Sequence, residues 1–280
     1  MELFSHHTHS HFCDGKLSPE EYVKKAIGSG LSYIGFSSHA PFDDAVSWTM
    51  NDALIDDYVT EIDRLKEFYK EEIDIYRSLE IDYIPGLTRS FSYWKKRAAL
   101  DYTIGSVHLI KGNSVQDLMF LDGPDTNFTY GLQRVFGNDI KQAVKAYYHQ
   151  INEMIEEEAP DIAGHIDKIK MNNKERFFQE DEKWYRDLQN ETLCLLEQTR
   201  TIVEVNTRGI YKKKSKELFP DSYFLTECCR REIPVTISSD AHHPQELLLG
   251  YQEVCQKLKR IGFGEIMKFS KGEWLEKSLL

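Results

Sequence analysis

Histidine and carboxylate side chains recur along this sequence at the ends of short apolar segments. His7 and His9 are two residues apart, so in an extended chain both imidazoles lie on one face. Asp240 and His242 have the same spacing. Other residues of the same kinds, also at the ends of apolar segments, are His39, Glu80, His108 and His165. Imidazole and carboxylate groups together suit Zn, Mn or Fe, so the pattern predicts a transition-metal site.

The local sequence around several of these residues leaves their roles open. His9-Ser10-His11 repeats the spacing of the first histidine pair, and His6 adds a further imidazole. Asp14 precedes a glycine, a combination that is typical of a turn. Glu80 lies between apolar residues in Ser78-Leu79-Glu80-Ile81-Asp82. Because carboxylates are rarely buried without a partner, a cation is the expected partner of Glu80.

The polar residues fall at or just beyond the carboxyl ends of predicted strands. We predict strands over residues 2–5, 33–36, 73–84, 102–109, a short segment ending at 165, 201–206, 234–238 and 263–269. Helices are predicted between them, over residues 18–30, 52–72, 139–158, 183–199, 220–231 and 244–260. This alternation of roughly six or seven β–α units favours a parallel barrel formed by one domain, residues 1–280. In such a barrel the carboxyl ends of the strands meet at one rim, where active sites are built.

Composition excludes several classes of protein. The chain has 280 residues and a formal net charge of −11, which disfavours a nucleic-acid partner. No run of about 18 apolar residues occurs, so no membrane span is predicted. The segment MELFSHHTHS has neither a basic nor an apolar region of a secretory signal. The five cysteines form no CxxC pair, so we expect neither a disulfide framework nor a zinc ribbon, and we expect a cytoplasmic protein.

Taken in order, these segments resemble the motifs of the PHP (polymerase and histidinol phosphatase) family. Within that family the chain most resembles the stand-alone histidinol-phosphate phosphatases. The matching segments are His7-Thr8-His9-Ser10, Asp14-Gly15, Ser38-His39-Ala40-Pro41, Leu79-Glu80-Ile81-Asp82, Ile104-Gly105-Ser106-Val107-His108, Gly164-His165, Glu204-Val205-Asn206-Thr207 and Ser239-Asp240-Ala241-His242. They extend over residues 7–242, so the resemblance covers most of the chain.

The resemblance implies a distorted (β/α)7 TIM-like barrel that binds three divalent metal ions. It also implies the register of the first histidine pair and a ligand set. The first metal would be bound by His7, His9 and Asp240, the second by His108 and His165, and the third by Asp14, His39 and His242. Glu80 would bridge the first two metals. His6, His11, His149 and His243 are then not expected to be ligands.

The activity implied by the resemblance is hydrolysis of L-histidinol phosphate to L-histidinol and phosphate, a step of histidine biosynthesis. Bound cations lower the pKa of water and so supply a nucleophile near neutral pH. No cysteine nucleophile is then needed, and Cys13 is expected to be a packing residue. Glu80 and Asp240 are the predicted catalytic residues. The acid that protonates the leaving alkoxide is either Asp240 or a water molecule on a metal.

A phosphate ester also needs cationic partners, and the guanidinium group of arginine matches phosphate oxygens. Arg208, which follows a predicted strand, is the first candidate, and Arg176 is the second. The aromatic content of residues 41–50 and 120–136 suggests that one of these segments contacts the organic part of the substrate.

Two alternatives stay open at this point. The chain could be a PHP phosphoesterase that acts on another phosphate monoester or a nucleotide, with a small-molecule ester as its partner in either case. It could also be a non-catalytic metal-binding protein, although an intact ligand set argues against that hypothesis. The identity of the metals and the oligomeric state do not follow from the sequence.

Overall fold

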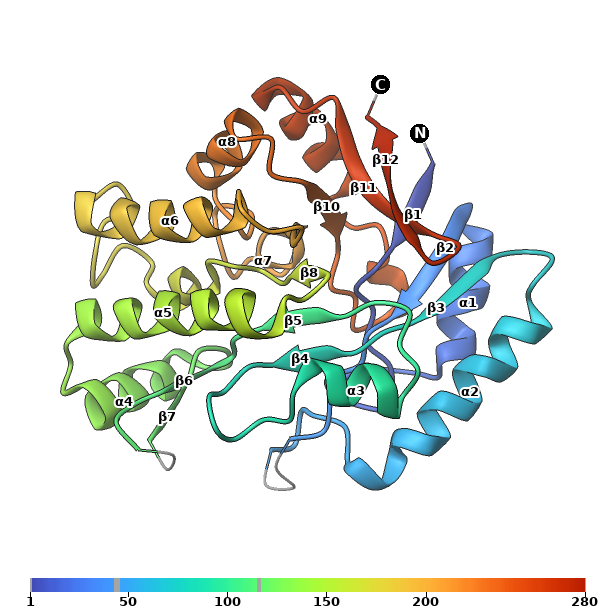
Figure 1. The fold of residues 1–280 in the computed structure, drawn as a ribbon, viewed down its shortest axis with the longest axis horizontal. Helices are drawn as coiled ribbons and strands as arrows, with labels where there is room; N and C mark the ends of the chain where they lie inside the picture. The colour runs from blue at the N-terminus through green and yellow to red at the C-terminus, as the bar shows by residue number, and fades with distance from the viewer. Residues whose placement is uncertain (1, 43–45, 115–116, 280) are drawn as a thin grey trace.

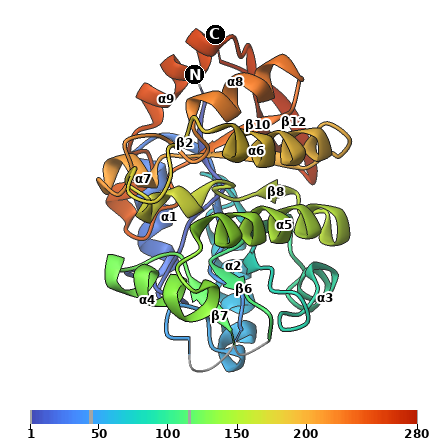
Figure 2. The same ribbon diagram turned by 90° about the vertical axis from the view of Figure 1, so that its left-hand side faces the viewer.

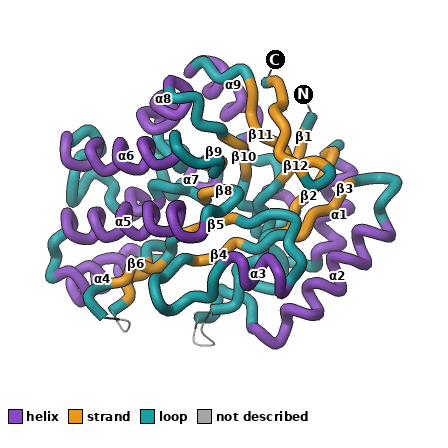
Figure 3. The backbone as a smooth tube through the Cα atoms, viewed as in Figure 1, coloured by secondary structure: helices purple, strands orange, loops and turns teal. Residues whose placement is uncertain are grey.

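Short parallel strands form two sheets in the computed structural model, which describes residues 2–42, 46–114 and 117–279. The first sheet has the order β1 (Leu3–Ser5), β2 (Leu31–Phe36), β3 (Asp74–Arg77). The second has the order β10 (Val235–Ser238), β9 (Ile202–Asn206), β8 (Ile162–Ala163), β5 (Ile104–Ser106), β4 (Glu80–Asp82). The strands cross the middle of the molecule and helices surround them (Figures 1 and 3). The protein is therefore an α/β protein built on parallel sheets.

Two isolated parallel bridges connect these two sheets. Thr8, beyond β1, pairs with Ala241, beyond β10, and the His9 N–H donates to the Ala241 carbonyl at 2.8 Å. His39, beyond β2, pairs with Glu80 at the start of β4. Both bridges lie at predicted ligands: Thr8 stands between His7 and His9, and His39 and Glu80 are predicted ligands themselves. The bridges therefore bring the polar ends of the two sheets to the same region.

The longer helices cover the sheets with their apolar faces. These are α1 (Pro19–Gly28), α2 (Ile55–Phe68), α3 (Phe91–Arg97), α4 (Asp125–Phe136), α5 (Ile140–Glu158), α6 (Lys183–Leu196), α8 (Ser222–Arg230) and α9 (Tyr251–Ile261). The shorter helical turns are η1 (Asp52–Leu54), η2 (Lys168–Asn172), α7 (Arg208–Tyr211) and η3 (Pro244–Glu246). Helices α5 and α6 lie side by side (Figures 1 and 2). Among the helices in the described ranges, none is both long and apolar enough to cross a membrane.

Helix α2 illustrates how helical spacing positions the sheet. Ile55, Tyr58, Ile62 and Leu65 recur on one face, and all four are buried. The Tyr58 hydroxyl lies 2.9 and 2.8 Å from the carbonyls of Phe36 and Ser78, and its one proton is shared between them. These two carbonyls lie just before the chain positions that carry His39 and Glu80. The helix therefore holds the ends of two neighbouring strands in place.

Most predicted strands are confirmed, but the predicted strand over residues 73–84 is divided. The structure contains β3 and β4 instead, because the chain changes its pairing partner between them. β3 pairs with β2, whereas β4 pairs with β5.

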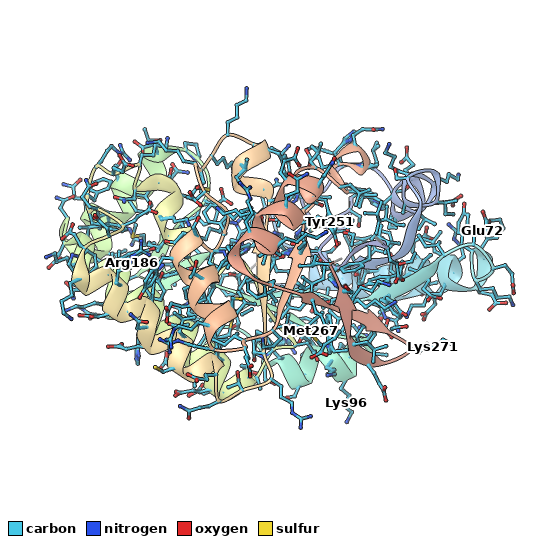
Figure 4. The ribbon with its side chains drawn as sticks, turned by 90° about the horizontal axis from the view of Figure 1, so that it is seen from above. Glu72, Lys96, Arg186, Tyr251, Met267 and Lys271 are labelled. Atoms are coloured by element: carbon cyan, nitrogen blue, oxygen red, sulfur yellow. The ribbon has the colours of Figure 1, made fainter. Side chains whose placement is uncertain are left out.

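The last predicted strand, residues 263–269, was not expected to be half of a hairpin. β11 (Glu265–Ser270) pairs antiparallel with β12 (Glu273–Ser278). Lys271 and Gly272 form the turn with φ angles of 51° and 89°, a conformation typical of two-residue hairpin turns. Lys271 lies at the tip of this hairpin, and Met267 lies within β11 (Figure 4). Helices α3 and α4 and the hairpin of β6 (Leu109–Lys111) with β7 (Leu118–Phe120) were not predicted from the sequence either.

Candidate metal centre

The nine side chains predicted as ligands converge at the carboxyl ends of the parallel strands. They are placed by the chain beyond β1 (His7, His9), the following loop (Asp14), the chain beyond β2 (His39), β4 (Glu80), and the segments beyond β5 (His108), β8 (His165) and β10 (Asp240, His242). Seven of them are buried, the His242 side chain is 14% exposed, and Asp14, at 36%, is the most exposed of the set. Distant sequence segments therefore form a single polar cluster.

Glu80 is the centre of this cluster. Its Oε2 lies 3.0 Å from His7 Nε2, 3.3 Å from His9 Nε2 and 3.2 Å from His39 Nδ1. Its Oε1 lies 2.9 Å from His165 Nε2. Burial acts to raise the pKa of Glu80, but the positive charge of the surrounding histidines lowers it well below the usual value. The side chain is therefore held as a carboxylate with both oxygens directed at imidazoles.

Three sets of possible ligand atoms are compact enough to hold one ion each. Within each set the atoms lie within 4.8 Å of one another. The sets are His7, His9, Asp240; then His39, Glu80, His108; then His9, Asp14, His39, His242. The first set has the same three members as the first metal site implied by the family resemblance. The third contains all three members implied for the third site, together with His9. The second differs from the implied second site, because it contains His39 and lacks His165, which belongs to none of the three sets.

Unpartnered ligand atoms test whether this cluster fits divalent cations. His9 Nε2, Asp14 Oδ1, His39 Nδ1 and Asp240 Oδ1 are buried, yet none makes a hydrogen bond to a described residue. Buried polar atoms in proteins almost always have a partner, so four such atoms in one cluster need an explanation. Nitrogen and oxygen donors of these kinds suit Zn, Mn or Fe. The residues present therefore fit bound cations.

The protein's own charges are strongly coupled at this site. Burial acts to lower the pKa of His7, but the charges of Glu204 and Glu80 outweigh this effect and raise the pKa to about 10. For His39, burial dominates and lowers the pKa well below its usual value. The pKa of Asp240 is lowered, since His7 and Arg208 outweigh the effect of burial. The cluster thus combines ionised carboxylates with imidazoles in different protonation states.

A further carboxylate, Asp82, lies behind one of the predicted ligands. Its Oδ1 lies 3.1 Å from His108 Nδ1 and accepts a hydrogen bond from the His108 backbone N–H at 2.8 Å. This contact leaves His108 Nε2 directed towards Glu80, 3.7 Å away. No role was predicted for Asp82 from the sequence. Its position two residues after Glu80, on the same face of β4, was the available signal.

A cavity of about 270 Å³ lies above the ligand cluster. One wall is aromatic, because the rings of Trp48 and Phe120 stack with centroids 5.8 Å apart. Trp48 also contacts His39, with a ring separation of 4.7 Å. The remaining charged groups of the lining are Asp14, Glu80, Asp122, Lys168, Arg208, Lys214 and Asp240. The cavity therefore offers the ligand cluster, a flat apolar surface and three cationic side chains to one small molecule.

The two predicted phosphate-binding arginines lie in different places. Arg208 lines the cavity, and its Nη1 donates to the Asp240 carbonyl at 2.7 Å. Arg176 does not line it: its exposed guanidinium pairs with the Asp125 carboxylate, with Nη1 to Oδ2 at 2.9 Å. The prediction for Arg176 thus does not agree with its position. The cause is α4, whose first residue, Asp125, was not predicted to be there to pair with it.

Lys168 occupies a position for which no cation was predicted. It is 5% exposed, lines the cavity, and its Nζ lies 3.0 Å from Asp122 Oδ2. It is the first residue of η2, three residues after His165. The predicted phosphate-binding residues were arginines, and no local pattern distinguishes Lys168 from the other lysines.

The histidines that were predicted to be non-ligands lie outside the three compact sets. His6 is buried, but its Nε2 lies 2.9 Å from the Tyr33 hydroxyl, on the apolar side of the strand. Cys13 lies at the edge of the cluster, with its Sγ 3.4 Å from His9 Nδ1. Its thiol therefore contacts a candidate ligand and does not line the cavity.

The chain is similar to proteins of a known family. A model of the PHP domain matches residues 5–208. The histidinol-phosphatase of Bacillus subtilis is 25% identical over 92% of this chain and 100% of its own length. A probable histidinol-phosphatase of Schizosaccharomyces pombe is 27% identical over 97% of this chain and 90% of its own.

Two solved structures have a similar fold. A putative histidinol phosphatase from Listeria monocytogenes superimposes with a TM-score of 0.78 at 22% identity, covering 90% of this chain and 100% of its own. The histidinol phosphate phosphatase of Lactococcus lactis, solved with zinc, L-histidinol and phosphate, gives a TM-score of 0.68 at 21% identity and covers 98% of both chains.

Proposed function

Because the chain belongs to the PHP domain family, we propose that it is a metal-dependent phosphatase that hydrolyses L-histidinol phosphate to L-histidinol and phosphate. This is a step of histidine biosynthesis. The observation that carries the proposal is the carboxylate–imidazole cluster around Glu80 at the floor of a cavity of about 270 Å³. Relatives named as histidinol-phosphatases that align over more than nine-tenths of the chain support the choice of substrate.

The metal content that best fits the cluster is three divalent ions of Zn, Mn or Fe. His7, His9 and Asp240 would hold the first, His108 and His165 the second, and His39, His242 and Asp14 the third, with Glu80 shared by the first two. When bound, such ions lower the pKa of a coordinated water and neutralise charge on phosphate oxygens. Compact sets of ligand atoms support the first and third sites, and the contacts of Glu80 Oε1 with His108 and His165 support the second.

Arg208 and Lys168 are the residues of this chain best placed to bind the phosphoryl group. Both line the cavity, and both lie close to carboxylates that border it: Arg208 Nε is 4.0 Å from Asp240 Oδ2, and Lys168 Nζ is 3.0 Å from Asp122 Oδ2. A dianionic phosphate attracts both cations. The planar imidazole of the substrate can lie against the stacked rings of Trp48 and Phe120. Residues 43–45 of the 41–50 segment lie outside the described residues.

For the architecture we propose a distorted (β/α)7 barrel formed by one domain, residues 1–280. The two bridges, Thr8 with Ala241 and His39 with Glu80, support closure of the two sheets into one ring. A closed ring explains why ligands from β1, β4 and β10 point to a common centre.

The substrate is tested by measuring phosphate release from a panel of esters with the metal-loaded protein. We expect a much higher kcat/KM for L-histidinol phosphate than for p-nitrophenyl phosphate, although the latter has the better leaving group. Preference for a poor leaving group requires binding energy from the rest of the substrate at the transition state. A better rate with p-nitrophenyl phosphate or a nucleotide would favour another phosphoesterase. No release from any ester by fully metallated protein would favour a non-catalytic metal-binding protein.

Arg208→Ala should lower kcat/KM by about 10-fold or more, the scale of a lost charge-assisted hydrogen bond of ~1.5–3 kcal/mol. The loss should occur with both L-histidinol phosphate and p-nitrophenyl phosphate, because both carry the same phosphoryl group. Arg176→Ala is the matched control, since its guanidinium pairs with Asp125 outside the cavity. Equal rates for Arg208→Ala and the control would remove Arg208 from phosphate binding.

A further inference from the structure

Glu204 lies in β9, a strand that contributes none of the nine predicted ligands. Its side chain is 1% exposed and is directed at the back of the cluster. Glu204 Oε1 lies 2.5 Å from His7 Nδ1 and accepts a hydrogen bond from the Ser238 hydroxyl. Glu204 Oε2 accepts from the His165 backbone N–H at 2.8 Å and from Asn206 Nδ2 at 3.1 Å. One buried carboxylate therefore contacts two candidate ligand residues from different strands.

The contact with His7 determines which ring nitrogen faces the cluster. An imidazole that binds a metal through one nitrogen carries its proton on the other. Glu204 accepts that proton at Nδ1, which leaves the Nε2 lone pair directed at the cluster, 3.0 Å from Glu80 Oε2 and 3.9 Å from Asp240 Oδ1. A carboxylate in this position fixes both the tautomer and the orientation of the ring.

A second connection runs from Glu204 to another predicted ligand. Asn206 Nδ2 donates to Glu204 Oε2 and also to Asp240 Oδ2, at 3.1 and 3.2 Å. The other oxygen of this aspartate, Oδ1, lies 3.3 Å from His9 Nε2 and 3.9 Å from His7 Nε2 and has no hydrogen bond to a described residue. The amide of Asn206 thus orients Asp240 so that its free oxygen faces the cluster.

We propose that Glu204 is a positioning residue that, directly through His7 and through Asn206 to Asp240, prepares the site for the first metal ion. The proposal rests on the metal centre described above, but not on which ester is hydrolysed. Glu204 has no role at the reacting atoms in this proposal, since it does not line the cavity.

Replacement by glutamine creates a conflict that either orientation of the amide fails to resolve. If the amide oxygen faces His7, the NH₂ group meets two donors, the His165 N–H and Asn206 Nδ2. If the NH₂ group faces His7, the Nδ1 atom must accept, and the ring proton moves to Nε2, where a metal would bind. The first orientation leaves donors facing each other, and the second places a proton on the Nε2 atom that would bind the metal.

The test is a titration of the metal-free protein with zinc, using a competing chelator to measure affinity. Glu204→Gln should weaken the binding of the ion held by His7 by about 10- to 100-fold, the usual cost of losing a group that orients a metal ligand. At saturating zinc, kcat should recover most of its value, because the catalytic residues are intact. Wild-type zinc affinity in Glu204→Gln would overturn the proposal.

Three comparisons separate positioning from general damage to the fold. Ser238→Ala removes another partner of the same Glu204 oxygen but keeps the carboxylate, so it should retain most of the affinity. Asp82→Asn should weaken a different ion, the one held by His108. If Glu204→Gln does not fold, Glu204→Asp decides the question: it keeps the charge but withdraws it from His7, and unchanged affinity would again overturn the proposal.

The zinc titration also keeps this proposal distinct from the proposed function. A protein that binds zinc in a Glu204-dependent manner but does not hydrolyse L-histidinol phosphate would leave the positioning role standing and remove the substrate. If the wild-type protein hydrolyses the ester and the Glu204→Gln variant binds zinc normally, the substrate stands and the positioning role is removed.

Discussion

Glu80→Gln should lower kcat for phosphate release by more than about 100-fold, because even groups that only orient a metal ligand contribute 10- to 100-fold. Glu80 is directed at five imidazoles, and its two oxygens face different ones, with Oε2 near His7 and Oε1 near His165. An amide has nearly the same size but carries no charge, and its NH₂ group cannot bind a cation. We therefore expect loss of turnover without a matching loss of folded protein.

The measurement combines initial rates, metal content and thermal unfolding of the same preparation. Glu67→Gln is the matched control, since this glutamate is exposed on α2 and its carboxylate pairs only with Lys70 among the contacts that the described residues show. The control should keep normal rates and metal content. Near-normal turnover and a full metal complement in Glu80→Gln would remove Glu80 from the mechanism.

Removal of the metals should abolish phosphate release, and addition of Zn, Mn or Fe should restore it. The reason is that bound cations would lower the pKa of water and so supply the nucleophile. Among the described residues that line the cavity, none is serine, threonine or cysteine, and its imidazoles and carboxylates, apart from Asp122, are candidate metal ligands. Cys13 contacts His9 and lies outside the lining. Activity that survives complete removal of the metals, verified by metal analysis, would contradict a metal-dependent reaction.

Metal removal should also become easier as pH falls. In the metal-free protein the pKa of His7 is raised to about 10, with burial opposing the shift and Glu204 and Glu80 producing it. Since a metal binds only the deprotonated nitrogen, it must displace a proton from His7 throughout the range below about pH 10. Raising the pH towards 10 therefore strengthens binding, and lowering it weakens binding. Zinc affinity measured at two pH values checks the sign, and an affinity independent of pH would contradict it.

The nature of the site and the kind of protein were predictable from the sequence because both depend on local patterns. Apolar segments alternate with amphipathic ones, and the resulting strands and helices form in nearly the predicted places. In a parallel sheet every strand presents its carboxyl end at the same edge. Polar residues such as His39 and His108, placed just after strands, were therefore expected to lie close together once the strands paired side by side.

The surroundings of the ligands depend on contacts between segments far apart in the chain, and only the tertiary structure decided them. Arg176 was a reasonable candidate until α4 placed Asp125 beside it. Lys168 became the cavity's buried cation because η2 turns it towards Asp122. The role inferred for Glu204 depends on β9 lying between β8 and β10, which brings its carboxylate to His7 across 197 residues of sequence. Spacing along one strand shows which face a side chain occupies, whereas the partner on that face is set by the packing of other strands.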